Sequence, residues 1–256
     1  MTALLASVRS AAEARIALAA GADVIDLKDP AAGALGALSG AEVVAAVAAV
    51  AGRVPVSATI GDDPAVDEIH SRVAALVECG VDIVKVGIAV GQSRGDDVLD
   101  ALRASIRNGA AIVVVLAADD GVDPRVLPAL AAAGVAGAML DTRDKTRGSL
   151  RDCVPEAELD AFVARARALG LVVGLAGSLR HRDIAPLLAL GPDYLGFRGL
   201  LCAGARRAGV LDARAVAAVR TAIPRAARES IAIAQGPPGR RAAAGGSRRL
   251  PGEKHA

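Results

Sequence analysis

The chain has 256 residues, of which 53% are hydrophobic, 23% are charged and 1% are aromatic. This length fits one large globular domain or two small ones. The longest apolar runs have about ten residues, roughly half of what a membrane-spanning helix needs, so the composition excludes a transmembrane protein. The N-terminal segment also lacks a basic lead and a long apolar stretch, and we expect a cytoplasmic protein without a secretory signal.

Short runs of aliphatic residues alternate along the chain with longer Ala-rich segments of helical period. Strands are predicted at 3–8, 23–28, 54–60, 82–88, 111–117, 135–141, 171–177 and 193–198. Each is followed by a predicted helix, at 10–20, 40–51, 64–78, 97–108, 123–133, 156–168, 180–190 and 212–222. A glycine stands just after seven of these helices, where a left-handed residue commonly ends a helix: Gly21, Gly52, Gly80, Gly109, Gly134, Gly170 and Gly191.

These eight strand–helix units predict an α/β fold, a (β/α)8 barrel of the TIM type, over residues 1–224. An open doubly wound sheet is the main alternative. A dinucleotide site is disfavoured, since the first strand leads into Ser7-Val8-Arg9-Ser10 and not into a GxGxxG turn.

The charge of the chain is unevenly distributed. The formal net charge is +2, from 30 basic and 28 acidic side chains, but residues 225–256 hold seven of the basic and two of the acidic ones. Residues 1–224 therefore carry a small negative charge. The basic segment 225–256 is rich in Gly, Pro and Arg without apolar periodicity, and we expect a disordered, solvated tail that does not engage nucleic acid.

In a barrel of this kind, functional groups come from the carboxyl ends of the strands. The second strand ends Asp26-Leu27-Lys28, so the period of two places Asp26 and Lys28 on the inner face and Leu27 on the outer one. The fourth strand carries Lys85 in the middle of an apolar run, where a lysine is costly unless it is paired or used.

Lysine usage also indicates these positions. The chain has 26 Arg but only four Lys, and Lys28, Lys85 and Lys145 all fall at or just after predicted strand ends. A lysine can lose its proton and attack a carbonyl, whereas an arginine cannot. This pattern favours Schiff-base or proton-transfer chemistry over buried Lys–Asp pairs with a purely structural role.

Two aspartates follow other strands. Asp141 ends the sixth strand and could hold an ammonium, move a proton or cap the next segment. Lys145, in the loop after it, is either a phosphate contact or a surface charge. Asp119 follows the fifth strand and Asp120 comes directly after it, and either could be a solvated loop residue.

The loops after the last two strands predict a phosphate site. Glycines there allow backbone N–H groups to approach an anion, and these loops are the usual phosphate seat of the fold. Arg198 could add a charged contact. The candidate phosphate-binding residues are Gly177, Ser178, Gly196, Arg198 and Gly199. No metal-ligand spacing, GxSxG or HExxH motif occurs, so we expect neither a metal nor an organic cofactor.

Six segments together resemble one family, (5-formylfuran-3-yl)methyl phosphate synthase. They are DVIDLKDPAAGALGA (23–37), VSATIGD (56–62), DIVKVGI (82–88), AMLDT (138–142), GLAGSL (174–179) and DYLGFRGLLC (193–202). The resemblance implies a barrel enzyme that joins two molecules of glyceraldehyde 3-phosphate into 4-(hydroxymethyl)-2-furancarboxaldehyde phosphate. Phosphate and water are lost, and the product serves a methanofuran-type cofactor.

The resemblance also implies roles for individual residues. Lys28 would form the Schiff base, Lys85 would accept a proton, and the family's aspartates would be Asp26 and Asp141. Lys145 would correspond to the family's loop lysine, although the surrounding loop, Asp144-Lys145-Thr146-Arg147-Gly148, departs from the Lys-Asp-Gly sequence often found there.

Functions of other classes stay open at this point. A lysine-dependent phosphosugar aldolase or decarboxylase would share the barrel, although the decarboxylase pattern Asp-x-Lys-x-x-Asp fails because residue 31 is Ala. A non-catalytic protein that binds a phosphorylated ligand or nucleic acid would not need three lysines at strand ends. The expected partner is a small triose phosphate, with no membrane involved, and the small apolar faces of the Ala-rich helices favour a homo-oligomer.

Overall fold

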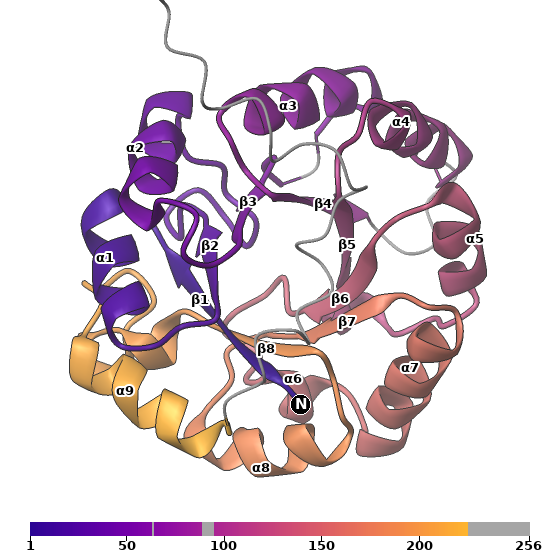
Figure 1. Cartoon of the computed structure of the whole chain (residues 1–256). Coiled ribbons are helices and arrows are strands. Elements are labelled where there is room, and N and C mark those ends of the chain that lie inside the picture. The colour runs from indigo at the N-terminus through magenta and orange to yellow at the C-terminus, as the bar shows by residue number, and fades with distance from the viewer. Residues whose placement is uncertain (63, 89–94, 225–256) are drawn as a thin grey trace, which may run out of the picture.

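Residues 1–62, 64–88 and 95–224, which this computed structural model describes, contain eight parallel strands that close into a barrel in chain order. They are β1 (Ala3–Val8), β2 (Val24–Leu27), β3 (Val56–Thr59), β4 (Ile83–Ile88), β5 (Ile112–Ala117), β6 (Gly137–Asp141), β7 (Val172–Leu175) and β8 (Tyr194–Phe197). β8 pairs with β1, with Leu5 opposite Gly196, which closes the barrel (Figure 1). The predicted (β/α)8 barrel is confirmed, and the open sheet is wrong.

The helices form a ring around the strands (Figure 1). They are α1 (Ala11–Ala19), α2 (Gly40–Val50), α3 (Val66–Glu78), α4 (Gly95–Arg107), α5 (Val126–Ala133), α7 (Glu156–Ala168), α8 (His181–Ala189) and α9 (Ala213–Ala222). All seven glycines predicted to end helices have positive φ. The sequence did not predict the short helix α6 (Leu150–Cys153) or the 3-10 turns η1 (Ala118–Asp120), η2 (Gly199–Leu201) and η3 (Ala203–Ala205).

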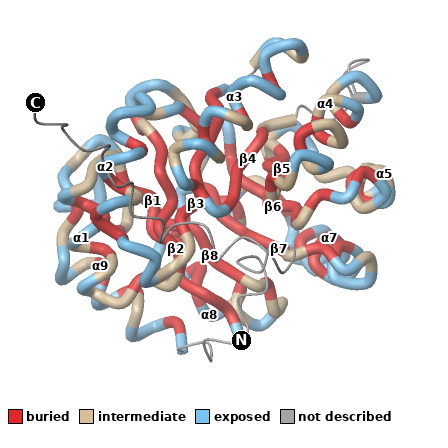
Figure 2. The backbone as a smooth tube through the Cα atoms, turned by 45° about the horizontal axis from the view of Figure 1, so that its top comes forward, coloured by how far each residue is buried: buried red, intermediate tan, exposed pale blue. Residues whose placement is uncertain are grey.

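Alternation along each strand divides the core into two apolar clusters. Outward residues such as Ile25 and Leu27 pack under the helices, whereas inward residues such as Ile83 and Tyr194 fill the barrel. The strands are buried along almost their whole length, while the outer faces of the helices are exposed (Figure 2). Gly174 leaves the space that the Tyr194 ring occupies, because a Cβ there would lie 2.3 Å from two ring carbons.

An aspartate stands just before β2, β4 and β8, in the motifs GAD, GVD and GPD. Each accepts a hydrogen bond from a backbone N–H of the preceding strand, at 2.7 to 2.8 Å: Asp23 from Leu4, Asp82 from Val56 and Asp193 from Val173. Ala136 holds the corresponding place before β6. These bonds fix the register at the amino end of the barrel.

The same spacing places functional side chains at the carboxyl end. Three residues after this position, the even-numbered strands carry Asp26, Lys85, Met139 and Gly196. Five residues after it, at or just beyond the carboxyl end of the same strands, stand Lys28, Gly87, Asp141 and Arg198. Alternate strands of a closed barrel contribute inward side chains to common layers. We call the first set the lower layer and the second the upper layer.

Two further expectations concern a membrane-spanning segment and the C-terminal tail. No helix among the described residues is both long and apolar enough to cross a membrane. Among the described residues the last helix, α9, ends at Ala222, and the predicted disordered tail, residues 225–256, lies outside them.

Candidate active site

The lower layer contains a buried ion pair between β2 and β4. Lys85 Nζ lies 2.6 Å from Asp26 Oδ1, and the two side chains are 3% and 0% exposed. Ser7 Oγ donates to the other carboxylate oxygen at 2.8 Å, and Ser57 Oγ donates to Oδ1 at 2.7 Å. Three donors from three strands therefore fix the Asp26 carboxylate, and sequence reasoning missed both serines.

Burial and charge affect the two partners differently. Burial alone would raise the pKa of Asp26, but the charges of Lys85 and Lys28 outweigh it and lower that pKa below its ordinary value. Burial lowers the pKa of Lys85, the charge of Lys28 lowers it further, and Asp26 opposes both. Lys85 therefore gives up its proton more readily than a surface lysine, beside a carboxylate that stays ionised.

The upper layer brings two lysines to one carboxylate. Asp141 Oδ2 lies 3.7 Å from Lys28 Nζ, and Asp141 Oδ1 lies 2.6 Å from Lys145 Nζ. Lys145 also donates to the backbone oxygen and, at 3.3 Å, to the hydroxyl of Thr142. Burial lowers the pKa of Lys145, and its side chain is 19% exposed. Lys145 is thus a member of the cluster, and not a solvated surface charge.

Asp119 shapes the loop that carries Lys145. It lies in η1 after β5, is half-buried, and accepts the backbone N–H groups of Arg143 and Asp144, both at 2.7 Å. Asp119 is therefore not a solvated loop residue, whereas its neighbour Asp120 is exposed. The sequence could not separate the two aspartates, because only the fold shows that Asp119 accepts backbone N–H groups of the 142–148 loop, whereas Asp120 Oδ2 lies 3.8 Å from the Arg143 side chain.

The loop between β2 and α2 covers part of the barrel mouth. Leu35 packs into the inner cluster with 8% exposure, where a Cβ on Gly87 would come within 2.6 Å of its Cδ1. Thr59 Oγ1 holds this loop through the backbone oxygen of Gly36 at 3.0 Å. The covering explains why Lys85, one layer below Gly87, is shielded from water.

A cavity of about 460 Å³ opens beside the upper layer. Its lining includes five cationic side chains and one carboxylate: Lys28, Lys145, Arg180, Arg198, Arg207 and Asp141. The glycines and the serine predicted to bind phosphate also line it: Gly177, Ser178, Gly196 and Gly199. The structure therefore brings Lys28, Lys145 and the predicted phosphate loops to one cavity. This cavity is suited to an anionic small molecule.

The loop after β7 has backbone groups free to bind an anion. Gly177 has a φ of 116°, and a Cβ there would lie 2.9 Å from the backbone nitrogen of Thr142. Ser178 has a φ of 45°. In the part of the chain that the structure describes, no protein acceptor receives the N–H of Ser178 or Leu179. Phosphate binding at this seat stays a prediction.

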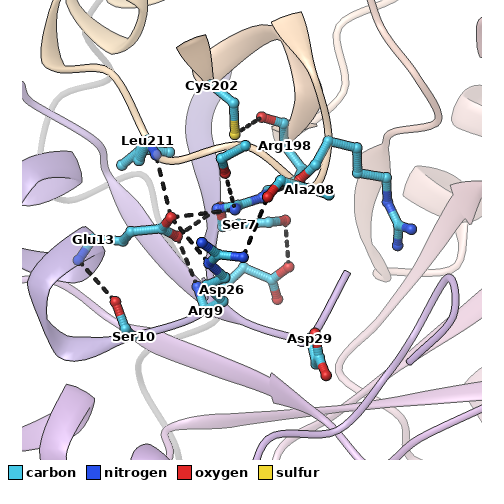
Figure 3. Close-up of polar contacts among 12 residues, drawn as sticks. Ser7, Arg9, Ser10, Glu13, Asp26, Asp29, Arg198, Cys202, Ala208 and Leu211 are labelled. Carbon is cyan, nitrogen blue, oxygen red and sulfur yellow. Dashed lines mark hydrogen bonds and ion pairs between the residues drawn. The ribbon is translucent and has the colours of Figure 1, made fainter. Parts of the chain in front are cut away.

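The guanidinium of Arg198, predicted to contact phosphate, is bound by protein acceptors. Its guanidinium donates to both oxygens of Glu13 in α1, at 2.5 and 3.2 Å. It also donates to the backbone oxygen of Ser7 at 3.2 Å (Figure 3). The backbone oxygens of Arg207 and Gly209 accept its other two N–H groups, at 3.0 and 2.9 Å. Burial alone would raise the pKa of Glu13, but Arg198 lowers it. All five N–H groups of Arg198 thus have protein acceptors, and this arrangement favours a structural role.

The described residues contain no group of three His, Cys, Asp or Glu side chains that could hold a metal ion. The three thiols are free: Cys79 and Cys153 are half-buried and Cys202 is buried.

Solved structures share this barrel. Phosphoribosyl anthranilate isomerase from Thermus thermophilus matches 87% of this chain and 98% of its own, with a TM-score of 0.62 and 16% identity. The 3-hexulose-6-phosphate synthase from Salmonella typhimurium matches 85% of this chain and 98% of its own, with a TM-score of 0.59 and 20% identity. At these identities the similarity establishes the fold alone.

Curated relatives are much closer in sequence. The chain is 48% identical over 228 residues, 87% of its length and 93% of the relative's, to a Methylorubrum extorquens protein named "Putative (5-formylfuran-3-yl)methyl phosphate synthase". It is 35% identical over 220 residues, 81% of its length and 93% of the relative's, to (5-formylfuran-3-yl)methyl phosphate synthase from Methanosarcina mazei. A sequence model described as 4-HFC-P synthase matches residues 4–220. The chain therefore belongs to the 4-HFC-P synthase family.

Proposed function

We propose that the chain condenses two molecules of glyceraldehyde 3-phosphate into 4-(hydroxymethyl)-2-furancarboxaldehyde phosphate, as a step toward a methanofuran-type cofactor. Membership of the synthase family supports this reaction. The observation that carries the proposal is the cluster of lysines and aspartates in two layers. Lys28 and Lys145 both form ion pairs with Asp141 beside the cationic cavity. One layer below, Lys85 forms an ion pair with Asp26.

The cluster supplies the groups that such a condensation needs. Lys28 attacks the aldehyde carbon of one triose phosphate, and water leaves to give a protonated imine. This imine withdraws electrons from the neighbouring carbon, whose proton passes to the neutral amine of Lys85. Burial and the charge of Lys28 favour this neutral form because they lower the pKa of Lys85. The resulting enamine attacks the aldehyde of the second triose phosphate, and this step forms the new carbon–carbon bond.

Atom balance sets the remaining steps. Two triose phosphates and one furancarboxaldehyde phosphate differ by one phosphate and two water molecules, and hydrolysis of the imine returns the Lys28 amine. Lys145 and Asp141, in contact at 2.6 Å, provide an acid and a base at the cavity wall for these eliminations. Asp26 keeps Lys85 in place and balances its charge.

The test is a balanced measurement of products. Purified enzyme is incubated with glyceraldehyde 3-phosphate, and inorganic phosphate and the furan aldehyde are quantified together. The proposal requires one phosphate released for each furan formed. A phosphosugar aldolase would form or cleave a carbon–carbon bond without releasing phosphate, and a decarboxylase would release carbon dioxide. Either result, or binding without turnover, would contradict the proposal.

A further inference from the structure

Arg207 lines the cavity but was not recognised from the sequence as a functional residue. It follows η3 in the loop between β8 and α9 and is half-buried. Its Nη1 donates to the backbone oxygen of Pro30 at 2.7 Å, and its Nη2 donates to that of Gly33. A guanidinium has five N–H groups. The other three have no protein acceptor among the described residues, so they remain for a ligand.

Hydrogen bonds to the backbone of its loop fix the position of Arg207. Arg198 Nε donates to the backbone oxygen of Arg207 at 3.0 Å, and Arg198 is itself fixed by the ion pair with Glu13. Glu13 also accepts the backbone N–H of Leu211 at 3.2 Å, so the same carboxylate holds the far end of the loop (Figure 3). Arg198 and Glu13 thus act as positioning residues for Arg207.

A second arginine lies on another side of the cavity. Arg180, the residue before α8, forms an ion pair with Asp152 of α6, with Arg180 Nη1 3.0 Å from Asp152 Oδ2. It borders the phosphate seat at Gly177 and Ser178. Arg207, by contrast, bridges to the β2–α2 loop. The two arginines therefore serve different walls of one cavity.

Charge indicates that the cavity suits phosphoryl groups. A phosphate monoester carries between about one and a half and two negative charges at neutral pH. The lining has five cations and one carboxylate, and two of the cations pair with carboxylates from outside the lining, Arg198 with Glu13 and Arg180 with Asp152. The other three cations, Lys28, Lys145 and Arg207, outnumber the one carboxylate of the lining, Asp141, so the cavity attracts phosphoryl groups.

We propose that Arg207 binds the second phosphoryl group of the substrate pair, opposite the seat formed by the β7–α8 loop. This inference rests on the proposed function, which supplies two phosphorylated substrates. The β7–α8 seat holds one phosphate through backbone N–H groups. Arg207 holds the other through its three remaining N–H groups, with Lys145 nearby as a second cation.

Direct titration tests the site without turnover. Inorganic phosphate is titrated calorimetrically into wild-type protein, Arg207→Gln and the control Arg206→Gln, whose residue is an exposed arginine of the same loop. We expect two phosphates per chain for wild type and Arg206→Gln. In Arg207→Gln one site should weaken roughly ten- to a hundredfold, as expected for the loss of a charged hydrogen-bonding partner. Retention of both sites in Arg207→Gln would overturn the proposal.

A second variant separates ligand binding from support of the loop. Arg207→Lys keeps the charge but cannot bond both Pro30 and Gly33 as the guanidinium does. If Arg207 binds phosphate, the lysine variant should retain most of the affinity that the glutamine variant loses. Equal loss in both variants would assign Arg207 to the loop alone. Because phosphate binding is scored without catalysis, absence of furan from wild type would count against the proposed function and leave this result intact.

Discussion

Lys85 and Asp26 form an ion pair across the inside of the barrel, with Lys85 Nζ 2.6 Å from Asp26 Oδ1 and side-chain exposures of 3% and 0%. A buried charge that loses its partner is strongly destabilising, whereas a matched pair of neutral residues is often tolerated. The pair is therefore a structural element as well as part of the proposed chemistry, and the two contributions can be separated by mutation.

Asp26→Asn should both destabilise the barrel and abolish turnover. The amide leaves the Lys85 ammonium without its counter-charge. Asp141, the other carboxylate that acts on Lys85, is already paired with Lys28 and Lys145. We expect a loss of about 3–5 kcal/mol in the free energy of unfolding. Urea titration at pH 7 measures it.

The control is the double variant Asp26→Asn with Lys85→Met. Removing both charges should recover much of the stability lost in the single variant, while furan formation stays absent because no amine remains at position 85 to accept the proton. Recovered stability without activity would separate the two roles. A double variant as unstable as the single one would show that packing, and not charge, dominates at this position.

Stability should fall in acid because of Asp26 and Asp141. The pKa values of both carboxyls lie below the ordinary aspartate value of about 3.9, since nearby lysine charges outweigh the effect of burial. Their contribution is complete above that ordinary value and is lost as pH falls through the lowered one. Urea unfolding between pH 7 and pH 2 should show this decline, and Asp141→Asn should show a shallower one. Equal slopes would contradict the assignment.

The sequence predicted the parts of the site that lie on strands. Inward and outward positions alternate strictly there, so Asp26, Lys28 and Lys85 could be placed on the inner face from the period of two alone. The two lysines stood out in the sequence because the chain has only four lysines. Asp141 followed from the end of the sixth strand in the same way.

The contributions of the loops could not be predicted. Arg207 and Asp119 act through contacts with segments more than 20 residues away, namely with Pro30 and with the backbone of Arg143. No periodicity links such positions. Arg198 was correctly placed at the end of its strand, but its partner Glu13 lies 185 residues earlier. Sequence alone could not show that this guanidinium is already bound.

Chelation should leave activity unchanged. The motivation is the lack of metal-ligand spacing in the sequence, together with the proposed roles of Lys28 as the nucleophile and Lys85 as the base. Enzyme dialysed against a strong chelator should form furan at the rate of untreated enzyme. Loss of activity that a divalent cation restores would show that this expectation is wrong.

A chain ending at Pro224 should fold and turn over normally. α9 ends at Ala222, and Ile223, which is 0% exposed, completes the apolar packing of the barrel. Residues 225–256 have no apolar period that could add a packed element. The melting temperature of the shortened chain should lie within about 2–4 °C of the full one, the shift expected for 1 kcal/mol. A larger fall would mean that the tail packs on the barrel.

Lys28 and Lys85 should differ in what their arginine variants retain. Lys28→Arg keeps the charge but cannot form an imine, so borohydride added during turnover should trap no triose on the peptide that contains residue 28, and no furan should form. Lys85→Arg should lose most turnover, because a guanidinium does not release its proton at neutral pH, yet an adduct on Lys28 should persist. Peptide mass spectrometry locates the adduct. Substantial activity in either variant would indicate a charge-only role, and an adduct on Lys85 in the wild-type protein would reverse the two assignments.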